Sequence, residues 1–470
     1  MRVVRARASA SAVVLRRERE DDLRRRPHGA ETNPVPIRRT VGTETGHLSG
    51  SDRWGTEDVH GGRAPGPSSP AVESTGSRAA GPLVTRRRLL SGGTVIAVGL
   101  GLAAASAPRT VLGRQVCAAG EARGWFRGVC SAGGEWGSLP TQMATTEYGR
   151  DWRYDSQETF DFLASRGHRV IRLVFLWERV QPRLGVDLDP ALLAHLSAAV
   201  DRIRAAGMTA ILDMHNYGRY RLPPTHVEHV LGQGVVTADH LADVWGRLAE
   251  VFSSNPGVHG YGLMNEPWDL ASGTPPERDA SWWHASQQTV DAIRATGDRT
   301  LVCVAGHTVS SARRPWDRRH PGPWIRDSAD NQVYEEHLYA DADGSGTYQR
   351  SLAEETALAV REGYDDVTGR TLAAVRPFID WCHRHRVRGY IGEFGVPTTG
   401  PDARGWAEVA EAVLDLADRT HTHLTWWATG ELFGDYRLAP YVPSRSGSPV
   451  DVVRSPVASV LEAHPSRGCR

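Results

Sequence analysis

The chain has 470 residues, of which 40% are hydrophobic and 23% charged, a balance that excludes disorder throughout. All 55 basic residues are arginine and 55 acidic residues match them, so the formal net charge is zero. Because the chain contains no lysine, Schiff-base chemistry and phosphate loops that need a lysine are excluded. Nothing in the overall charge indicates a nucleic-acid partner.

Residues 1–83 are predicted to form a disordered leader. The segment is dominated by Arg, Gly, Ser and Pro, has Trp54 as its single aromatic residue, and shows no apolar periodicity. Such a composition cannot bury enough apolar surface to offset the entropy of folding. An alternative is that the segment is not translated and that Val84 is the start.

Residues 84–107 resemble a twin-arginine export signal. Arg86 and Arg87 precede an apolar run rich in Gly and Ala, which ends in small residues suited to cleavage. The run is shorter than the roughly 20 residues that span a bilayer. We therefore expect a secreted protein, a linker at 108–121, and no membrane attachment once the signal is removed.

The cysteines define neither a disulfide framework nor a zinc site. Their number is odd, so they cannot all pair within one chain, and their spacing matches no zinc pattern. We expect Cys303, which lies in an apolar run, to be an inert core residue. The five are Cys117, Cys130, Cys303, Cys382 and Cys469.

Residues 122–465 are expected to form one catalytic domain. Eight short apolar segments recur along it, and amphipathic helical segments lie between several of them. The predicted strands are 126–129, 170–176, 209–212, 260–263, 301–304, 332–335, 387–391 and 424–427. The predicted helices are 189–206, 237–254, 283–296, 371–385 and 404–418.

This alternation indicates an α/β protein whose parallel strands close into a (β/α)8 TIM barrel. A doubly wound open sheet is the alternative, but no glycine-rich phosphate turn follows the first strand. In such barrels the active site lies at the C-terminal ends of the strands. Polar or aromatic residues stand there on six predicted strands: Arg172, His215, Asn265, Glu266, His337, Tyr339, Glu393 and Trp427.

Two of these side chains suggest the cleavage of a glycosidic bond. Glu266 and Glu393 leave the fourth and seventh strands and should face each other across the barrel mouth. Glycoside hydrolysis needs a proton donor at the leaving oxygen and an anion at the anomeric carbon, so their pKa values must differ. Arg172 can keep one carboxylate ionised, Asn265 can bind a sugar 2-hydroxyl, and Trp427 offers a flat apolar face.

Residues 122–465 resemble glycoside hydrolase family 5, the cellulase-type retaining enzymes of the large (β/α)8 clan. The resemblance rests on the order and spacing of short motifs across the domain. They are Arg-Gly-Val at 127–129, Arg172, Leu-Asp-Met-His-Asn-Tyr at 212–217, Gly-Leu-Met-Asn-Glu-Pro at 262–267, His-Leu-Tyr at 337–339, Gly-Glu-Phe-Gly at 392–395 and Trp-Trp-Ala-Thr-Gly at 426–430.

The resemblance implies a secreted endo-β-1,4-glucanase that retains the anomeric configuration, with Glu266 as acid/base and Glu393 as nucleophile. It also implies that Arg172, His215, Asn265, His337 and Tyr339 line the subsite of the cleaved sugar. Two departures from the family pattern stand out: His259 replaces a usual aliphatic residue, and Glu431-Leu432-Phe433 replaces a more aromatic loop. The second departure leaves open the outer subsites, and with them mannan, xyloglucan or β-1,3-glucan as substrate. A catalytically inactive sugar-binding barrel is a further alternative.

Several other residues near strand ends are expected to be structural. Glu178 should cap or pair at the surface, and Glu335 and Glu336 must point to opposite sides of their strand. We expect Trp282 and Trp283 to pack in the core or an interface, whereas Trp177 and Trp268 remain divided between sugar platform and cleft wall. We predict no cofactor, no catalytic metal and a monomer whose partner is a β-glucan polysaccharide or oligosaccharide.

Overall fold

A computed structural model describes residues 124–468, except 139–142, 144, 271–274, 308–309 and 444–451. The predicted leader at 1–83, the export signal at 84–107 and the linker at 108–121 lie outside the described residues, as do Cys117 and Cys469. Cys130, Cys303 and Cys382 are buried free thiols. None of the helices in the described part of the chain combines the length and the apolar content needed to cross a membrane.

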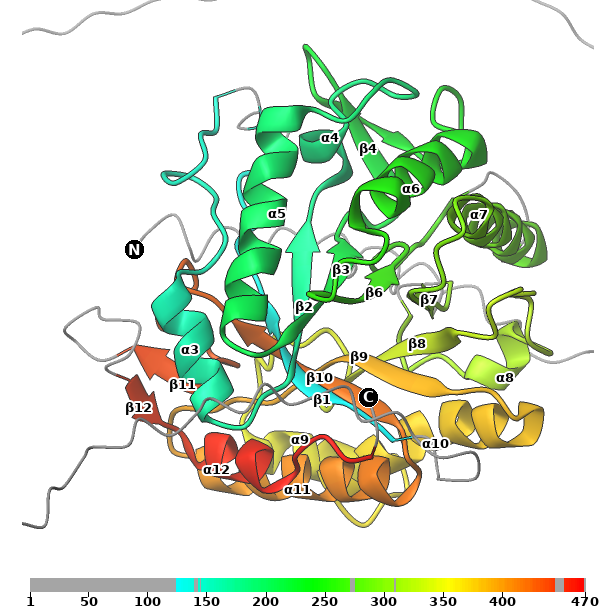
Figure 1. Cartoon of the computed structure of the whole chain (residues 1–470). Coiled ribbons are helices and arrows are strands. Elements are labelled where there is room, and N and C mark those ends of the chain that lie inside the picture. Colours follow the sequence, from blue (N-terminus) through cyan, green and yellow to red (C-terminus); the bar gives the residue numbers. More distant parts are fainter. Residues whose placement is uncertain are drawn as a thin grey trace, which may run out of the picture. The chain divides into compact units, whose positions relative to one another are not determined.

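The predicted (β/α)8 barrel is confirmed. Eight parallel strands form a closed sheet, in which β1 pairs with β2 on one side and with β10 on the other (Figure 1). Each strand overlaps a predicted segment. Around the ring the strands are β1 (Arg127–Ser131), β2 (Val170–Phe175), β3 (Thr209–Met214), β6 (Val258–Gly262), β7 (Leu301–Ala305), β8 (Gln332–Tyr339), β9 (Gly389–Gly395) and β10 (His423–Thr429).

Helices lie between the strands in the chain, and all five predicted helices are present. They are α5 (Pro190–Ala205), α6 (Ala238–Phe252), α7 (Pro275–Ala295), α10 (Val367–His385) and α11 (Ala403–Arg419). Further helices that the sequence pattern did not predict are α3 (Gln157–Ser165), α4 (Trp177–Val180), α8 (Trp316–Arg319), α9 (Leu352–Arg361) and α12 (Pro456–Ala463).

Local side-chain chemistry sets several helix starts. The Asp189 carboxylate accepts hydrogen bonds from two backbone N–H groups in the first turn of α5, and Pro190 occupies the first helical position. A Ser351–Glu354 capping box begins α9. The Asp366 carboxylate accepts from the Gly369 N–H, which explains why α10 begins a turn earlier than predicted.

Two short antiparallel hairpins extend the barrel. The first joins β4 (Arg219–Leu222) to β5 (Val227–Val230) and follows the C-terminal end of β3. The second joins β11 (Tyr441–Pro443) to β12 (Val452–Arg454) and precedes α12. Because the first hairpin follows a barrel strand at the end where the predicted site lies, it belongs to the wall of the mouth.

The core lies between the barrel and its helices, and large aromatic side chains fill much of it. Trp282 is fully buried and donates its indole N–H to the Ala305 carbonyl, so the expected core role is confirmed. Trp177 is equally buried and belongs to the core, so the prediction that it serves as a sugar platform or a cleft wall is wrong. Trp268 is half-buried, with the Arg219 guanidinium 4.0 Å from its ring centroid.

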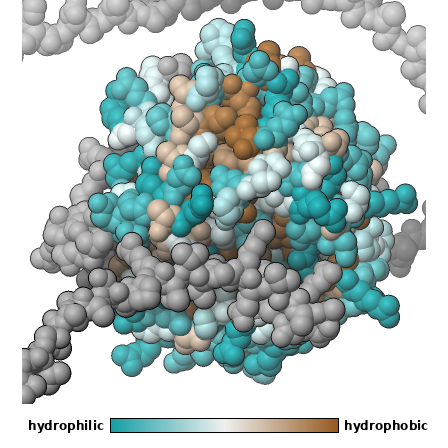
Figure 2. Space-filling model, viewed as in Figure 1, coloured by the Kyte–Doolittle hydropathy of each residue, from teal (hydrophilic) through white to brown (hydrophobic). Residues whose placement is uncertain are grey.

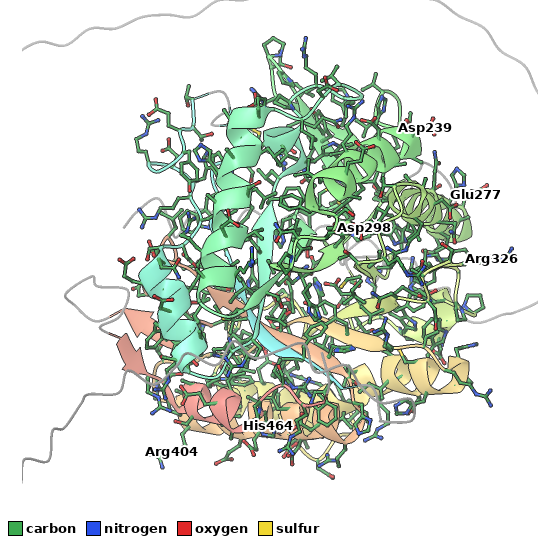
Figure 3. All side chains as sticks on the ribbon, in the orientation of Figure 1. Asp239, Glu277, Asp298, Arg326, Arg404 and His464 are labelled. Atoms are coloured by element: carbon green, nitrogen blue, oxygen red, sulfur yellow. The ribbon has the colours of Figure 1, made fainter. Side chains whose placement is uncertain are left out.

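The described residues on the face of the domain shown in Figure 2 are mainly hydrophilic. In the view of Figure 2 polar residues cover most of the surface, and hydrophobic residues gather near the top, where α4, α5 and α6 lie. Charged side chains such as Glu277 on α7 and Arg404 on α11 are exposed (Figure 3). This partition is that of helices which bury one stripe and solvate the other.

Candidate active site

All eight predicted site residues meet at the C-terminal ends of the barrel strands. Hydrogen bonds join Arg172 to Glu393 and Asn265, His337 to Glu266, and Tyr339 to Glu393. His215 lies 3.4 Å from Asn265 through Nε2 and stacks on Trp427, with ring centroids 5.1 Å apart and an interplanar angle of 5°. The strand ends therefore assemble one continuous polar cluster with an aromatic wall.

Glu266 and Glu393 face each other within this cluster. Glu266 follows β6 and Glu393 lies on β9, three strands further around the ring. One carboxylate oxygen of each and a ring nitrogen of His337 all lie within 4.8 Å of one another. The Glu266 backbone has a φ of 41°, in the left-handed region that side chains other than glycine rarely adopt. Such strain is characteristic of functional positions held by the surrounding fold.

The surroundings of Glu393 favour its ionised form. Burial alone would raise its pKa, but the charges of His337 and Arg172 outweigh burial and bring the pKa below its ordinary value. Arg172 Nη1 donates to Glu393 Oε1 at 2.9 Å, and the Tyr339 hydroxyl donates to Oε2 at 2.7 Å. Both oxygens are thus held in place, as a positioned anion requires.

Glu266 has the opposite tendency. Burial raises its pKa in spite of the hydrogen bond and charge of His337. Its side chain is 14% exposed, against 6% for Glu393. The site therefore holds one carboxyl group that tends to keep its proton beside one that tends to lose it, which is the division of roles that acid/base and nucleophilic chemistry need.

His337 is a buried cation in contact with both carboxylates. Its Nδ1 lies 2.8 Å from Glu266 and 3.5 Å from Glu393, and its Nε2 lies 3.1 Å from Glu335. Burial alone would lower its pKa, but the charge of Glu393 and the hydrogen bonds to Glu266 and Glu335 raise it to about 10. The ring is therefore positively charged at neutral pH.

Residues 130–432 match the sequence model of the family described as Cellulase (glycosyl hydrolase family 5). The chain belongs to glycosyl hydrolase family 5. Within this family, it is similar to the endoglucanase Cel5A of Pseudomonas stutzeri, whose structure in complex with cellobiose is 32% identical over 72% of this chain and 92% of that chain, with a TM-score of 0.60. It is also similar to the endo-beta-1,4-glucanase Xac0029 of Xanthomonas axonopodis pv. citri, at 29% identity over 72% and 98% of the two chains and a TM-score of 0.59.

The chain is also similar to a fungal endoglucanase. Endo-beta-1,4-glucanase B of Emericella nidulans is 27% identical over 346 residues, which cover 72% of this chain and 91% of that protein. The family and these relatives show that the chain is a glycoside hydrolase of the cellulase type.

In this family 5 hydrolase two acidic residues of the cluster escaped the sequence prediction. Asp213 lies 2.8 Å from His215 and 3.0 Å from Arg172. Glu335, expected to be merely structural, directs its carboxylate into the site and contacts Arg172 and His337. The signal that was available is their position two residues before a site histidine, which puts both side chains of each pair on one face of the strand.

The prediction that Glu178 pairs at the surface is wrong. Its side chain is 1% exposed and is held by Arg221 Nη1 at 2.9 Å and Asn216 Nδ2 at 2.5 Å. Arg221 comes from the β4–β5 hairpin. Because a hairpin that the sequence pattern did not predict supplies this cation, Glu178 pairs inside the protein and not in solvent.

Metal ligation is geometrically conceivable at two places in the described part of the chain. One is the Glu266, His337 and Glu393 cluster, and the other comprises Glu411, Asp415 and His464. In the first, both nitrogens of His337 are engaged with carboxylate oxygens of Glu266 and Glu335. The absence of a catalytic metal stays a prediction.

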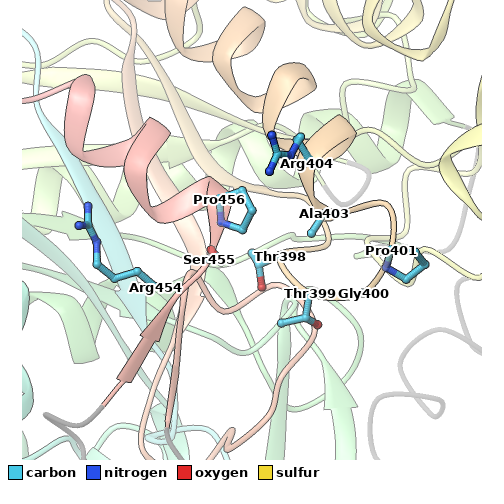
Figure 4. A pocket seen from close by; sticks show the side chains of 9 residues that line it. All are labelled: Thr398, Thr399, Gly400, Pro401, Ala403, Arg404, Arg454, Ser455 and Pro456. Carbon is cyan, nitrogen blue, oxygen red and sulfur yellow. The ribbon is translucent and has the colours of Figure 1, made fainter.

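A separate recess of about 570 Å³ lies at the N-terminal ends of α11 and α12, away from the cluster (Figure 4). It is lined by Thr398, Thr399, Gly400, Pro401, Ala403, Arg404, Arg454, Ser455 and Pro456. No predicted site residue lines it, so the catalytic assignment rests on the strand ends alone.

Proposed function

We propose that the chain is a secreted endo-β-1,4-glucanase that works by double displacement, with Glu393 as nucleophile and Glu266 as acid/base. The observation that carries the proposal is the pair of carboxyl groups, that of Glu393 buried and that of Glu266 partly buried, which lie close together and have oppositely shifted pKa values. Family membership supplies the reaction class, and the names of the related endoglucanases supply the substrate class.

The first step forms a glycosyl-enzyme. The ionised Glu393 oxygen attacks the anomeric carbon while protonated Glu266 gives its proton to the leaving glycosidic oxygen. Arg172 and Tyr339 hold the nucleophile by one hydrogen bond to each of its oxygens. In the second step ionised Glu266 takes a proton from water, and the water oxygen displaces Glu393 from the sugar.

The distance between the two carboxylates supports retention of configuration. Inverting enzymes separate them by about 6.5–9.5 Å to leave room for a water, whereas retaining enzymes hold them about 5–5.5 Å apart. Here an oxygen of each lies within 4.8 Å of the other. So close an approach favours the retaining arrangement, in which the carboxylate itself attacks the anomeric carbon.

The aromatic wall supports a pyranose substrate at the cleavage point. Trp427 is half-buried and stacks on His215, which holds its ring in place beside Asn265. In the Glu431-Leu432-Phe433 loop, the Glu431 carboxylate is held by hydrogen bonds that it accepts from the Ser156 N–H and the Thr159 hydroxyl. The loop therefore offers a sugar chain an apolar surface and not an additional charge.

Hydrolysis of a polysaccharide panel tests the proposal. Release of reducing ends is measured on carboxymethylcellulose, glucomannan, xyloglucan and laminarin for the wild type, Glu266→Gln and Glu393→Gln. We expect carboxymethylcellulose to be cleaved and both variants to be inactive on it. Preference for another polymer would change the assigned substrate, and binding without hydrolysis of any of the four would contradict the enzymatic proposal.

Secretion by a twin-arginine signal is part of the proposal and rests on residues 84–107 alone. N-terminal sequencing of the protein from the native host's medium tests it. A mature chain that begins near Ser106 or Pro108 is expected, and full-length protein confined to the cytoplasm would contradict it.

A further inference from the structure

Each imidazole of the site is held by a carboxylate two residues earlier in the chain. Asp213 contacts His215 at 2.8 Å, and Glu335 contacts His337 at 3.1 Å. Both acids also reach the same cation, since Arg172 Nη2 lies 3.0 Å from Asp213 and 3.2 Å from Glu335. A second layer of charge therefore lies beneath the groups that face the sugar.

The barrel is built to admit the Glu335 carboxylate. Its side chain is 3% exposed, and the one oxygen Oε1 accepts from both Arg172 and His337. The pairing register of β8 and β9 shifts between Glu336 and His337, which leaves Gly392 as an extra residue of β9. A Cβ atom at Gly392 would lie 1.9 Å from Glu335 Oε1. Any other residue at that position would displace the carboxylate.

The contacts of His337 fix its protonation. Nδ1 faces Glu266 and Glu393, and Nε2 faces Glu335. Nε2 faces the Glu335 carboxylate and Nδ1 lies 3.5 Å from the ionised Glu393, so a proton on each nitrogen serves these two acceptors and makes the ring an imidazolium. The charged groups that act on His337 and Glu266 come from several strands. They are Glu335 on β8, Glu393 on β9 and His215 after β3, with Arg172 on β2 in contact with Glu335 and Asp213 on β3 in contact with Arg172 and His215.

We propose that Glu335 is a positioning residue for the reaction: it anchors the His337 imidazolium so that its Nδ1–H donates to Glu266, and the active enzyme carries two protons on the Glu266–His337 pair. The inference rests on the proposed function, because it needs Glu266 to be the proton donor. Glu335 itself is 3% exposed and contacts Arg172 and His337, so it acts through His337 and not on the sugar directly.

The variant Glu335→Gln keeps the shape of the side chain and removes its charge. Without that negative charge, the first of the two protons leaves the Glu266–His337 pair at lower pH. We expect the alkaline limb of the kcat/KM profile to move to lower pH by about one pH unit, so that kcat/KM above the limb falls about tenfold. Glu335→Asp keeps the negative charge, so its alkaline limb should lie close to the pH of the wild-type limb.

Glu336→Gln is the matched control. Glu336 is the next residue of the strand, equally buried, and belongs to the opposite face, where its charge acts on Cys382 of α10. Its alkaline limb should coincide with that of the wild type. An alkaline limb at the wild-type pH in Glu335→Gln, or an equal shift in both variants, would overturn the inference.

A second measurement needs neither activity nor the variant's stability. In the full chain with ¹⁵N-labelled histidine, the His337 resonances should be those of a doubly protonated ring at pH 7. A neutral His337 at that pH would overturn the inference even if Glu335→Gln does not fold. Failure of the proposed function would instead appear in the wild type, as absent glucan hydrolysis, and would leave the histidine resonances unchanged.

Discussion

Replacing Arg172 by methionine tests how the site keeps its nucleophile ionised. The guanidinium is fully buried and donates to Glu393 at 2.9 Å and to Asn265 at 2.7 Å, with Asp213 and Glu335 also in contact. Methionine retains an unbranched side chain and removes the cation. A neighbouring arginine lowers a carboxyl pKa by about 1–3 units, so we expect the acidic limb of the kcat/KM profile to rise by roughly that many pH units.

The size of the effect depends on pH in a predictable way. Below the shifted limb, kcat/KM falls about tenfold for each pH unit of displacement, a loss of 1.36 kcal/mol each, and it recovers as the pH rises. The variant also loses stability, by about 3–5 kcal/mol at neutral pH, because buried carboxylates lose their counter-charge. Profiles on a soluble cello-oligosaccharide, with urea unfolding measured in parallel, separate the two effects.

Arg127→Met is the matched control for this experiment. Arg127 is also buried and paired, with Asp418 at 2.6 Å, but it begins β1 at the opposite end of the barrel. The Arg127→Met variant should be less stable than the wild type but should keep the acidic limb of its kcat/KM profile at the wild-type pH. A uniform loss of activity in Arg172→Met with an unmoved limb, or an equal shift in Arg127→Met, would refute the reasoning.

Three further variants give independent outcomes. Glu266→Gln should lower kcat/KM on polysaccharide by about 10²–10⁴-fold. It should largely spare glycosyl-enzyme formation from a dinitrophenyl cellobioside, because that leaving group needs no proton. Equal losses on both substrates would contradict an acid role for Glu266. Trp427→Ala should raise KM more than it lowers kcat in steady-state assays, because it removes a binding face and no reacting group; an unchanged KM would speak against a platform. Burial raises the pKa of Glu336 well above its ordinary value, so its contribution to stability is complete at acidic pH and is lost as the pH rises. Glu336→Gln should therefore unfold in urea like the wild type at pH 4 and be more stable than the wild type at pH 8. Equal stability of the two proteins at pH 8 would contradict a protonated Glu336.

The sequence predicts the barrel because each strand can be recognised from its own residues. Buried parallel strands read as short apolar runs, and eight of them in one domain leave few architectures. The predicted site follows from the same logic, since the ends of parallel strands meet, and Arg172, Glu266 and Glu393 do lie together. The two hairpins are not predicted from the sequence, because segments such as Arg219–Leu222 carry no apolar run.

Strand periodicity left the choice between Glu335 and Glu336 open. It places them on opposite sides of β8 but does not say which side is the interior. The choice follows from the pairing with β9, where Gly392 makes room for Glu335. Its companion Asp213 is similarly accommodated, since a Cβ atom at Gly262 would lie 3.0 Å from its Oδ1. Such contacts depend on strand register, which a single sequence does not display.

Trapping the glycosyl-enzyme tests the central claim most directly. The wild-type protein is incubated with a 2-deoxy-2-fluoro-cellobioside that carries a good leaving group, and its intact mass and peptides are then measured. We predict one added fluoro-cellobiosyl group, attached to the peptide that contains Glu393 and absent in Glu393→Gln. A label on another residue would contradict the assigned nucleophile, and full hydrolysis of the reagent to the inverted anomer without any label would contradict double displacement.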